Sequence, residues 1–93
     1  MENPNDIKVY VHVKVDFCED GIMLPKEIIW EDGVSYKIDR VTDIRQAAAM
    51  RAGGQGDRYS IVVGGKQSYL FFERSTNQTG NNIGRWFVER KTF

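Results

Sequence analysis

Residues 7–17 read Ile-Lys-Val-Tyr-Val-His-Val-Lys-Val-Asp-Phe, and this stretch decides the fold. Every odd position is apolar, whereas the even positions carry Lys, Tyr, His, Lys and Asp. Because successive side chains of a β-strand point to opposite faces, this alternation predicts a strand with one buried and one wet face. The run is longer than the usual strand of about 5–6 residues. We therefore expect it to bend and to serve both sides of a small barrel.

A first hairpin is expected after the turn that follows this strand. Residues 27–30 are expected to pair with residues 34–38, because Glu31-Asp32-Gly33 between them is typical of a three-residue hairpin loop. Pro25 has no backbone N–H and is confined to the start or the edge of a strand. We therefore expect useful pairing to begin near Glu27.

Residues 40–50 carry two expectations of different kinds. The apolar phase slips at Val41, which predicts that the strand passes through a β-bulge after Arg40 and continues to Ile44. Residues 43–50 (Asp-Ile-Arg-Gln-Ala-Ala-Ala-Met) are the only stretch with good helix propensity, and Asp43 is a suitable N-cap. At most one short helical turn is therefore expected here.

The second half of the chain predicts another hairpin and a last strand. Residues 58–63 and 67–74 are rich in aromatic and β-branched side chains, and they flank Gly64-Gly65-Lys66, a tight-turn sequence. A Gly-rich loop over residues 52–57 precedes this hairpin, and residues 83–91 supply the last expected strand.

Together these elements predict one all-β domain over residues 1–93. We expect five to six mostly antiparallel strands, with at most one short helical turn, closed into an SH3-like small barrel. An OB-like barrel or an open β-roll is the alternative. Closure removes the exposed strand edges that so small a sheet would otherwise leave. A chain of this length has room for one core and no second domain.

The charges balance overall but not locally. Thirteen Lys and Arg match thirteen Asp and Glu, so no net charge draws the protein to nucleic acid or to an anionic membrane. Residues 1–33 hold eight acids and three bases, and residues 34–93 hold five acids and ten bases. The halves of −5 and +5 are expected to lie side by side in one barrel and to neutralise one another.

The chain carries features of a cytoplasmic protein. Cys18 is its single cysteine, so no intramolecular disulfide is expected. The first residues lack a basic and apolar leader, and no apolar run is long enough to span a bilayer. We therefore expect a cytoplasmic location and no membrane contact.

Gly53-Gly54-Gln55 resembles the Gly-Gly-Gln loop of peptide release factors and related ribosome-rescue hydrolases. The resemblance implies a small hydrolase in which Gln55 is the working residue. Two other interpretations explain the same three residues. They are a plain Gly-rich connector between strands, or a loop whose backbone N–H groups bind an anion.

Few residues are suited to metal binding or catalysis. His12 and Asp16 share the wet face of the first strand, but Cys18 lies beyond its end and no fourth ligand is evident. With one His and one Cys in the chain, an acid–base or nucleophilic enzyme has few groups to use. We therefore expect no metal, no cofactor and no catalytic residue.

The chain has more residues suited to binding a partner than to catalysis. Leu70-Phe71-Phe72 and Trp86-Phe87 are adjacent on strands, so each run sends aromatic rings to both faces. Outward aromatic rings beside Arg suit the stacking of nucleic-acid bases or the gripping of a protein partner. The candidate binding residues are Trp30, Tyr36, Arg58, Tyr59, Arg74, Arg85 and Trp86. Alternatively, a second subunit covers them and the chain is a structural homodimer subunit.

One longer pattern resembles a known group of sequences. Residues 30–41 (Trp-Glu-Asp-Gly-Val-Ser-Tyr-Lys-Ile-Asp-Arg-Val), followed by Arg58-Tyr59 and by residues 85–89 (Arg-Trp-Phe-Val-Glu), resemble a pattern in short bacterial proteins of unknown function. The likeness is spread over most of the chain and consists of strand and turn residues. It implies a small barrel and brings no catalytic assignment.

Overall fold

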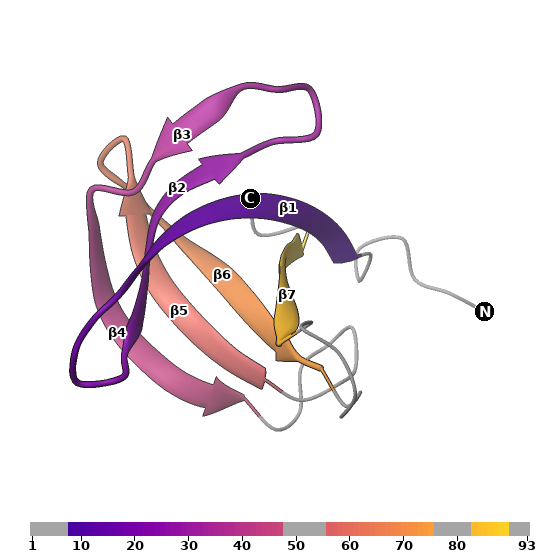
Figure 1. The fold of residues 1–93 in the computed structure, drawn as a ribbon. Coiled ribbons are helices and arrows are strands. Elements are labelled where there is room, and N and C mark those ends of the chain that lie inside the picture. The colour runs from indigo at the N-terminus through magenta and orange to yellow at the C-terminus, as the bar shows by residue number, and fades with distance from the viewer. Residues whose placement is uncertain (1–7, 48–55, 76–82, 90–93) are drawn as a thin grey trace.

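The computed structural model describes residues 8–47, 56–75 and 83–89 of the chain. Within these ranges the regular structure is entirely β-strand and contains no helix, which confirms the all-β class. The seven strands of these ranges are β1 (Lys8–Phe17), β2 (Met23–Ile29), β3 (Ser35–Lys37), β4 (Arg40–Ala47), β5 (Gly56–Val63), β6 (Lys66–Arg74) and β7 (Gly84–Glu89). Figure 1 shows them as one strongly curved sheet that forms a half-barrel.

The sheet runs in the order β3-β2-β1-β7-β6-β5-β4, and each pair of neighbours is antiparallel. β1 belongs to both halves because it changes partner along its length. Residues 8–11 pair with β7, and residues 12–17 pair with β2. Figure 1 shows this strand arching over the barrel. The expectation that the long first strand serves both sides is therefore confirmed.

One bent run of chain joins the two ends of the sheet. The Ile38 N–H donates to the Lys26 carbonyl at 2.9 Å, and the next residue, Asp39, donates to the Val62 carbonyl at 2.7 Å. The chain therefore changes its pairing partner from β2 to β5 within two residues. The segment before this bend is β3, which pairs with β2, and the segment after it is β4, which pairs with β5. This bend is one reason why seven strands are present in the described ranges where five to six were expected. Beyond the bend, β2 and β4 are not paired with each other.

The expected bulge is confirmed and the expected helical turn is wrong. The register between β4 and β5 shifts between Val41 and Asp43, and the extra residue, Thr42, hydrogen-bonds the Ser60 carbonyl through its hydroxyl at 3.2 Å. Residues 43–47 then continue as strand against β5. Cross-strand pairing therefore overrides the local helix propensity here. Residues 48–50 lie outside the described residues.

Pro25 lies inside β2 rather than before it, so pairing begins at Met23 and not near Glu27. The register with β1 shifts at this point, because Lys14 pairs with Glu27 whereas Val15 pairs with Pro25. A bulge is one of the few places where a strand tolerates proline, since the missing N–H is not needed there. The buried Pro25 ring thus becomes part of the wall of the barrel.

The main core fills the inside of the half-barrel, and a smaller aromatic cluster lies outside it. The buried inner residues are Val9, Ile28, Ile38, Tyr59, Ile61, Leu70, Phe72, Trp86 and Val88. On the other face Phe71 and Phe87 are buried and stacked, with ring centroids 5.1 Å apart. The adjacent aromatic residues of β6 and β7 do point to both faces, as the sequence predicted.

Candidate functional site

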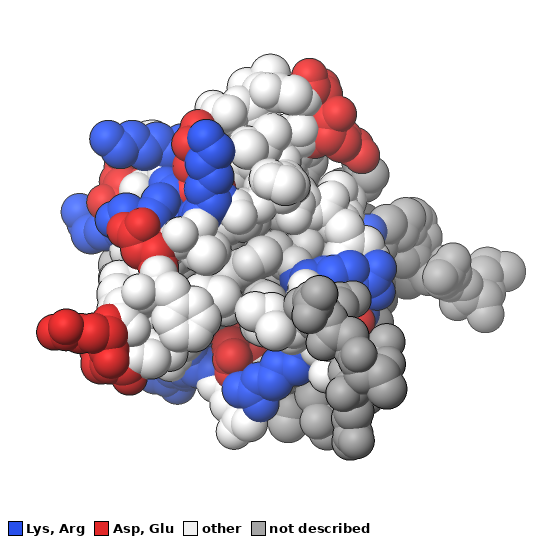
Figure 2. Space-filling model, viewed as in Figure 1, with Lys and Arg blue, Asp and Glu red and all other residues white. Residues whose placement is uncertain are grey.

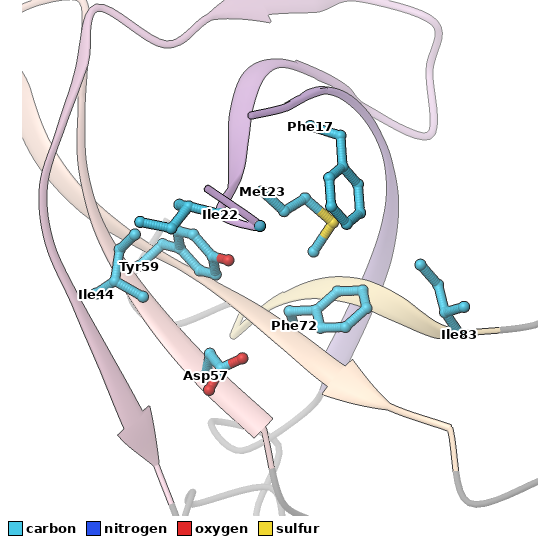
Figure 3. Close-up of a pocket in the computed structure, with 9 residues that line it drawn as sticks. Phe17, Ile22, Met23, Ile44, Asp57, Tyr59, Phe72 and Ile83 are labelled. Atoms are coloured by element: carbon cyan, nitrogen blue, oxygen red, sulfur yellow. The ribbon is translucent and has the colours of Figure 1, made fainter. Parts of the chain in front are cut away.

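A pocket of about 390 Å³ lies at the end of the half-barrel where β2 and β4 are unpaired. Its lining comes from five strands and from segments far apart in the sequence. The lining residues are Phe17, Gly21, Ile22, Met23, Ile44, Asp57, Tyr59, Phe72 and Ile83. Figure 3 shows Ile22 and Ile44 on one side near the Tyr59 ring, and Phe17 and Met23 above Phe72. The pocket is thus an apolar hollow with one carboxylate.

A short turn positions the upper wall of this pocket. The Cys18 N–H donates to the Ile22 carbonyl at 2.8 Å, and the Gly21 N–H donates to the Cys18 carbonyl at 2.9 Å. Asp20 accepts the Ile22 N–H at 3.1 Å through its carboxylate. Gly21 adopts a φ of 88°, which glycine takes at little cost. These bonds hold the Ile22 side chain at the end of β2 facing β4.

The walls of the pocket are unusually exposed for large apolar side chains. Phe17 is 70% exposed, Ile83 is 64%, Ile22 is 44% and Ile44 is 40%. Single exposed apolar residues are ordinary on a protein surface, but a contiguous group marks a binding or assembly site. Here four such residues surround one hollow.

The floor of the pocket is rigid and aromatic. Tyr59 and Phe72 are almost fully buried, and both pack against Trp86, with ring centroids 5.0 and 4.9 Å apart. Three buried rings in mutual contact leave little freedom for any of them to move. The floor is therefore preformed.

Asp57 and Tyr59 give the pocket a polar corner. Asp57 accepts a hydrogen bond from the Arg74 guanidinium at 2.8 Å, and Figure 3 shows its carboxylate and the Tyr59 hydroxyl directed into the hollow. Burial raises the pKa of Tyr59, the Asp57 charge raises it further and the Arg74 charge lowers it. The hydroxyl is therefore neutral near pH 7.

A second group of polar side chains covers the outer face of β1, β6 and β7. Glu73 accepts hydrogen bonds from the Lys8 ammonium at 2.9 Å and from the Tyr10 hydroxyl at 3.0 Å. Arg85 donates to the Tyr10 hydroxyl at 3.2 Å and lies over its ring, while Lys8 lies over the ring of Phe87. The hydrogen bond from Lys8 is the largest cause that lowers the pKa of Glu73. This group closes over the buried Phe87.

The structure brings three of the candidate binding residues together at the pocket. Tyr59 forms its floor, Trp86 supports that floor from below, and Arg74 holds Asp57 at its rim. Asp57 is a site residue that the sequence reasoning missed.

The other candidate binding residues lie elsewhere. Arg58 and Arg85 are on the outer face, with Arg58 over the Tyr69 ring at 5.1 Å. The buried Arg58 Nε has no hydrogen-bond partner among the described residues. Trp30 packs against the core just after β2, and Tyr36 is on β3. The seven candidates therefore do not form a single face.

Residues 53–55, the Gly-Gly-Gln loop, lie outside the described residues. In the described ranges, no group of three or more His, Cys, Asp or Glu gathers where it could hold a metal ion. The same ranges contain no helix long and apolar enough to cross a membrane.

The sequence reasoning missed the apolar walls of the pocket. The sequence predicts Phe17, Ile44 and Ile83 only as strand residues, and it carries no expectation for Ile22. No short motif links residues so far apart, because only the curvature of the sheet brings them together. The sequence signal that could have indicated the pocket is an apolar residue at or next to the end of several strands, as at Phe17, Ile22 and Ile83.

Comparison with protein-family models, with curated proteins and with solved structures gives no match for this chain. The resemblance of residues 30–41 and 85–89 to short bacterial proteins therefore stays a prediction.

Proposed function

We propose that this protein is a non-catalytic binding module that holds an apolar segment of a partner protein in the pocket at the open end of its half-barrel. The observation that carries the proposal is the gathering of Phe17, Ile22, Ile44 and Ile83 around a buried aromatic floor. Water contacts these side chains in the free protein, and a partner that covers them gains the hydrophobic free energy of their burial.

The shape of the pocket favours a protein segment over a small molecule. Pockets for small molecules enclose roughly 70–90% of their ligand. The walls here are themselves largely exposed, so they cover one side of an occupant and leave the other side open. Interfaces between proteins use such a preformed hollow to receive one or two large apolar or aromatic side chains. Asp57 and Tyr59 would bind a hydrogen-bond donor carried by the same segment.

The charges favour a protein partner over nucleic acid. Three basic residues that could bind phosphate already lie against carboxylates, since Lys8 and Arg85 lie against Glu73 and Arg74 lies against Asp57. Figure 2 shows basic and acidic side chains side by side around a central uncharged area, rather than a continuous basic surface. Single-stranded nucleic acid is bound in basic grooves with stacking aromatics, and its affinity falls with salt.

The SH3-like barrel remains our proposed fold class. A strand that bends and pairs with both ends of the sheet is a usual way for a small barrel to turn its corner. Ile38 and Asp39 make such a bend. Barrels of this kind recognise peptides through grooves lined by aromatic residues.

A selection of displayed random peptides tests the proposed function. Selected peptides are measured against the wild type, against Ile22→Lys at the pocket wall and against Val34→Lys as the matched control. Val34 is exposed to 46% and Ile22 to 44%, but Val34 does not line the pocket. We expect Ile22→Lys to weaken binding by about tenfold or more, because a charge in an apolar contact loses that burial. Val34→Lys should bind as the wild type does.

Three outcomes would contradict the proposal. They are a selection without enrichment, equal binding by Ile22→Lys and the wild type, and equal loss in both variants. Salt-sensitive binding of a single-stranded oligonucleotide, measured in parallel by filter retention, would favour the nucleic-acid alternative. The hydrolase alternative is tested by Gln55→Ala, which should leave peptide binding unchanged and would abolish any ester hydrolysis that depends on this loop.

A further inference from the structure

The outer edge of β4 is a long strand edge that no strand of the described ranges pairs with. β4 is the last strand of the sheet and pairs only with β5 among the described residues. No strand of the described ranges therefore takes up the backbone groups on its other side. Proteins usually protect such edges, because an open strand edge pairs readily with another chain. The described sheet ends in β3 on one side and in β4 on the other. β4 has eight residues and β3 has three, so the β4 edge is the longer one.

The side chains of β4 alternate across this edge in a way that is self-complementary. After the bulge, Ile44 lies opposite the inward Tyr59 and so faces the inside of the half-barrel. Asp43 and Arg45 flank it on the outer face, with Arg45 Nε 2.7 Å from Asp43 Oδ2. An acid and a base stand at equal distances on either side of one apolar residue.

We propose that two copies of this chain pair antiparallel along β4, with Ile44 on the two-fold axis. Each Asp43 then lies directly opposite Arg45 of the second copy, and the two Ile44 side chains lie opposite each other. Opposite charges facing each other across a strand pair are stabilising. A two-fold axis normal to the sheet also makes the contact closed and isologous. The proposal does not rest on the proposed function of the pocket.

Charge selects this register among its neighbours. Residues that lie opposite each other must share a face of the sheet, so a slip by an odd number of residues would turn the apolar side outward. Centring the pair on Asp43 would place the two Asp43 carboxylates opposite each other. Centring it on Arg45 would do the same to two guanidinium groups. Like charges in such positions are destabilising, so of these three registers the one centred on Ile44 is favoured.

The proposed dimer has a consequence for the pocket. Antiparallel strands related by this axis keep the same face of the sheet on the same side. Ile44 of each copy lines the pocket of that copy. The two pockets would therefore open on one side of the dimer and share a wall formed by the two Ile44 residues.

Charge exchange tests the interface. We expect the wild type to show a mass that rises with concentration in sedimentation equilibrium. Asp43→Lys alone and Arg45→Glu alone should each weaken the dimer by about tenfold or more, because each places like charges opposite each other. The double variant Asp43→Lys/Arg45→Glu restores opposite charges and should dimerise as the wild type does.

Mixing the two single variants removes the objection that either one is misfolded. In the mixed pair, the lysine introduced by Asp43→Lys in one copy meets the glutamate introduced by Arg45→Glu in the other. The unchanged Arg45 of the first copy meets the unchanged Asp43 of the second, so the heterodimer should form where neither variant dimerises alone.

Three results would overturn the proposal. They are a single-variant charge change that leaves dimerisation intact, a mixture of the two single variants that stays monomeric, and a wild type that is monomeric at every concentration. A wild type that is monomeric at every concentration would mean that the β4 edge does not pair with a second copy of this chain.

Disulfide trapping tests the register. In a Cys18→Ser background, Ile44→Cys should form a covalent dimer on oxidation, because residues opposite each other in an antiparallel pair lie about 4.5–5.5 Å apart between Cα atoms. Gln46→Cys is the control, since residue 46 of one copy lies about four residues, or roughly 13 Å, from residue 46 of the other. Equal trapping of both variants, or trapping of Gln46→Cys alone, would refute this register.

Discussion

Replacing Glu73 by Gln removes the charge at the centre of the outer polar group without changing its size. The carboxylate accepts hydrogen bonds from the Lys8 ammonium at 2.9 Å and from the Tyr10 hydroxyl at 3.0 Å. The Glu73 and Lys8 side chains are only 23% and 18% exposed, so water screens their attraction less than it does for a surface pair. We therefore expect Glu73→Gln to lower the free energy of unfolding near neutral pH.

The size of this loss follows from the burial of the pair. Hydrogen bonds to charged groups contribute about 1.5–3 kcal/mol when buried, whereas exposed ion pairs contribute about 0–1 kcal/mol. The Glu73 group lies between these limits, and the amide of Gln still accepts one hydrogen bond. We expect a loss of about 1–2 kcal/mol. Asp16→Asn is the control, because Asp16 and Lys26 are well exposed and 3.7 Å apart, and it should cost less than about 0.5 kcal/mol.

The loss should depend on pH in one direction. The pKa of Glu73 lies below its ordinary value of 4.5 in the folded protein, chiefly because Lys8 donates a hydrogen bond to the carboxylate. A group whose folded pKa is lowered contributes its full stability above the unfolded pKa and loses it as the pH falls through the folded pKa. Urea unfolding of wild type and variant should therefore differ near pH 7 and differ less at an acidic pH below 4.5. An equal difference at both pH values would refute this reasoning.

Three further changes test the fold and the pocket. Gly56→Ala should cost about 2 kcal/mol or more in urea unfolding, because its Cβ would collide with the Phe72 carbonyl oxygen, whereas Gly21→Ala meets no neighbouring atom and should cost only the strain of its positive φ, about 1 kcal/mol. Tyr59→Phe should remove a tyrosine that ionises above pH 10.0 in an ultraviolet titration, since burial raises its pKa; an unchanged absorbance change above pH 10.0 would contradict this. Phe87→Ala should cost about 3–5 kcal/mol in thermal or urea unfolding, and a cost below about 1 kcal/mol would show that the outer cluster is not packed.

The parts of the fold that were predicted are those set by neighbouring residues. The alternation of residues 7–17 is a local property, and so is the phase slip at Val41 that indicated the bulge. The tight turn at Gly64-Gly65 likewise carries its own conformational requirement, since both residues have positive φ. The strand, the bulge and the turn appear in the structure where the sequence placed them, but the predicted buried face of the first strand does not extend to Val15 and Phe17, which are exposed.

The parts that were not predicted depend on contacts between distant segments. Residues 43–47 have helix propensity, but their pairing with β5 makes them a strand. The bend at Ile38–Asp39 is set by hydrogen bonds to β2 and β5 and not by a local signal. The pocket depends on the same long-range geometry, because Phe17, Ile44 and Ile83 meet only when the sheet has curled.

Among the described residues, the hydrogen bonds of Ile38 and Asp39 tie this bent run to both β2 and β5 at one end of the barrel. At the opposite end, the width of the pocket opening is set by the distance between the Cys18–Ile22 turn and β4. No described strand pair has to break for this distance to change. If a partner segment occupies the pocket as proposed, we therefore expect a bulkier segment to move these two walls apart about their common base. The stiffness of the bent run at Ile38 and Asp39 would then limit the largest segment that fits.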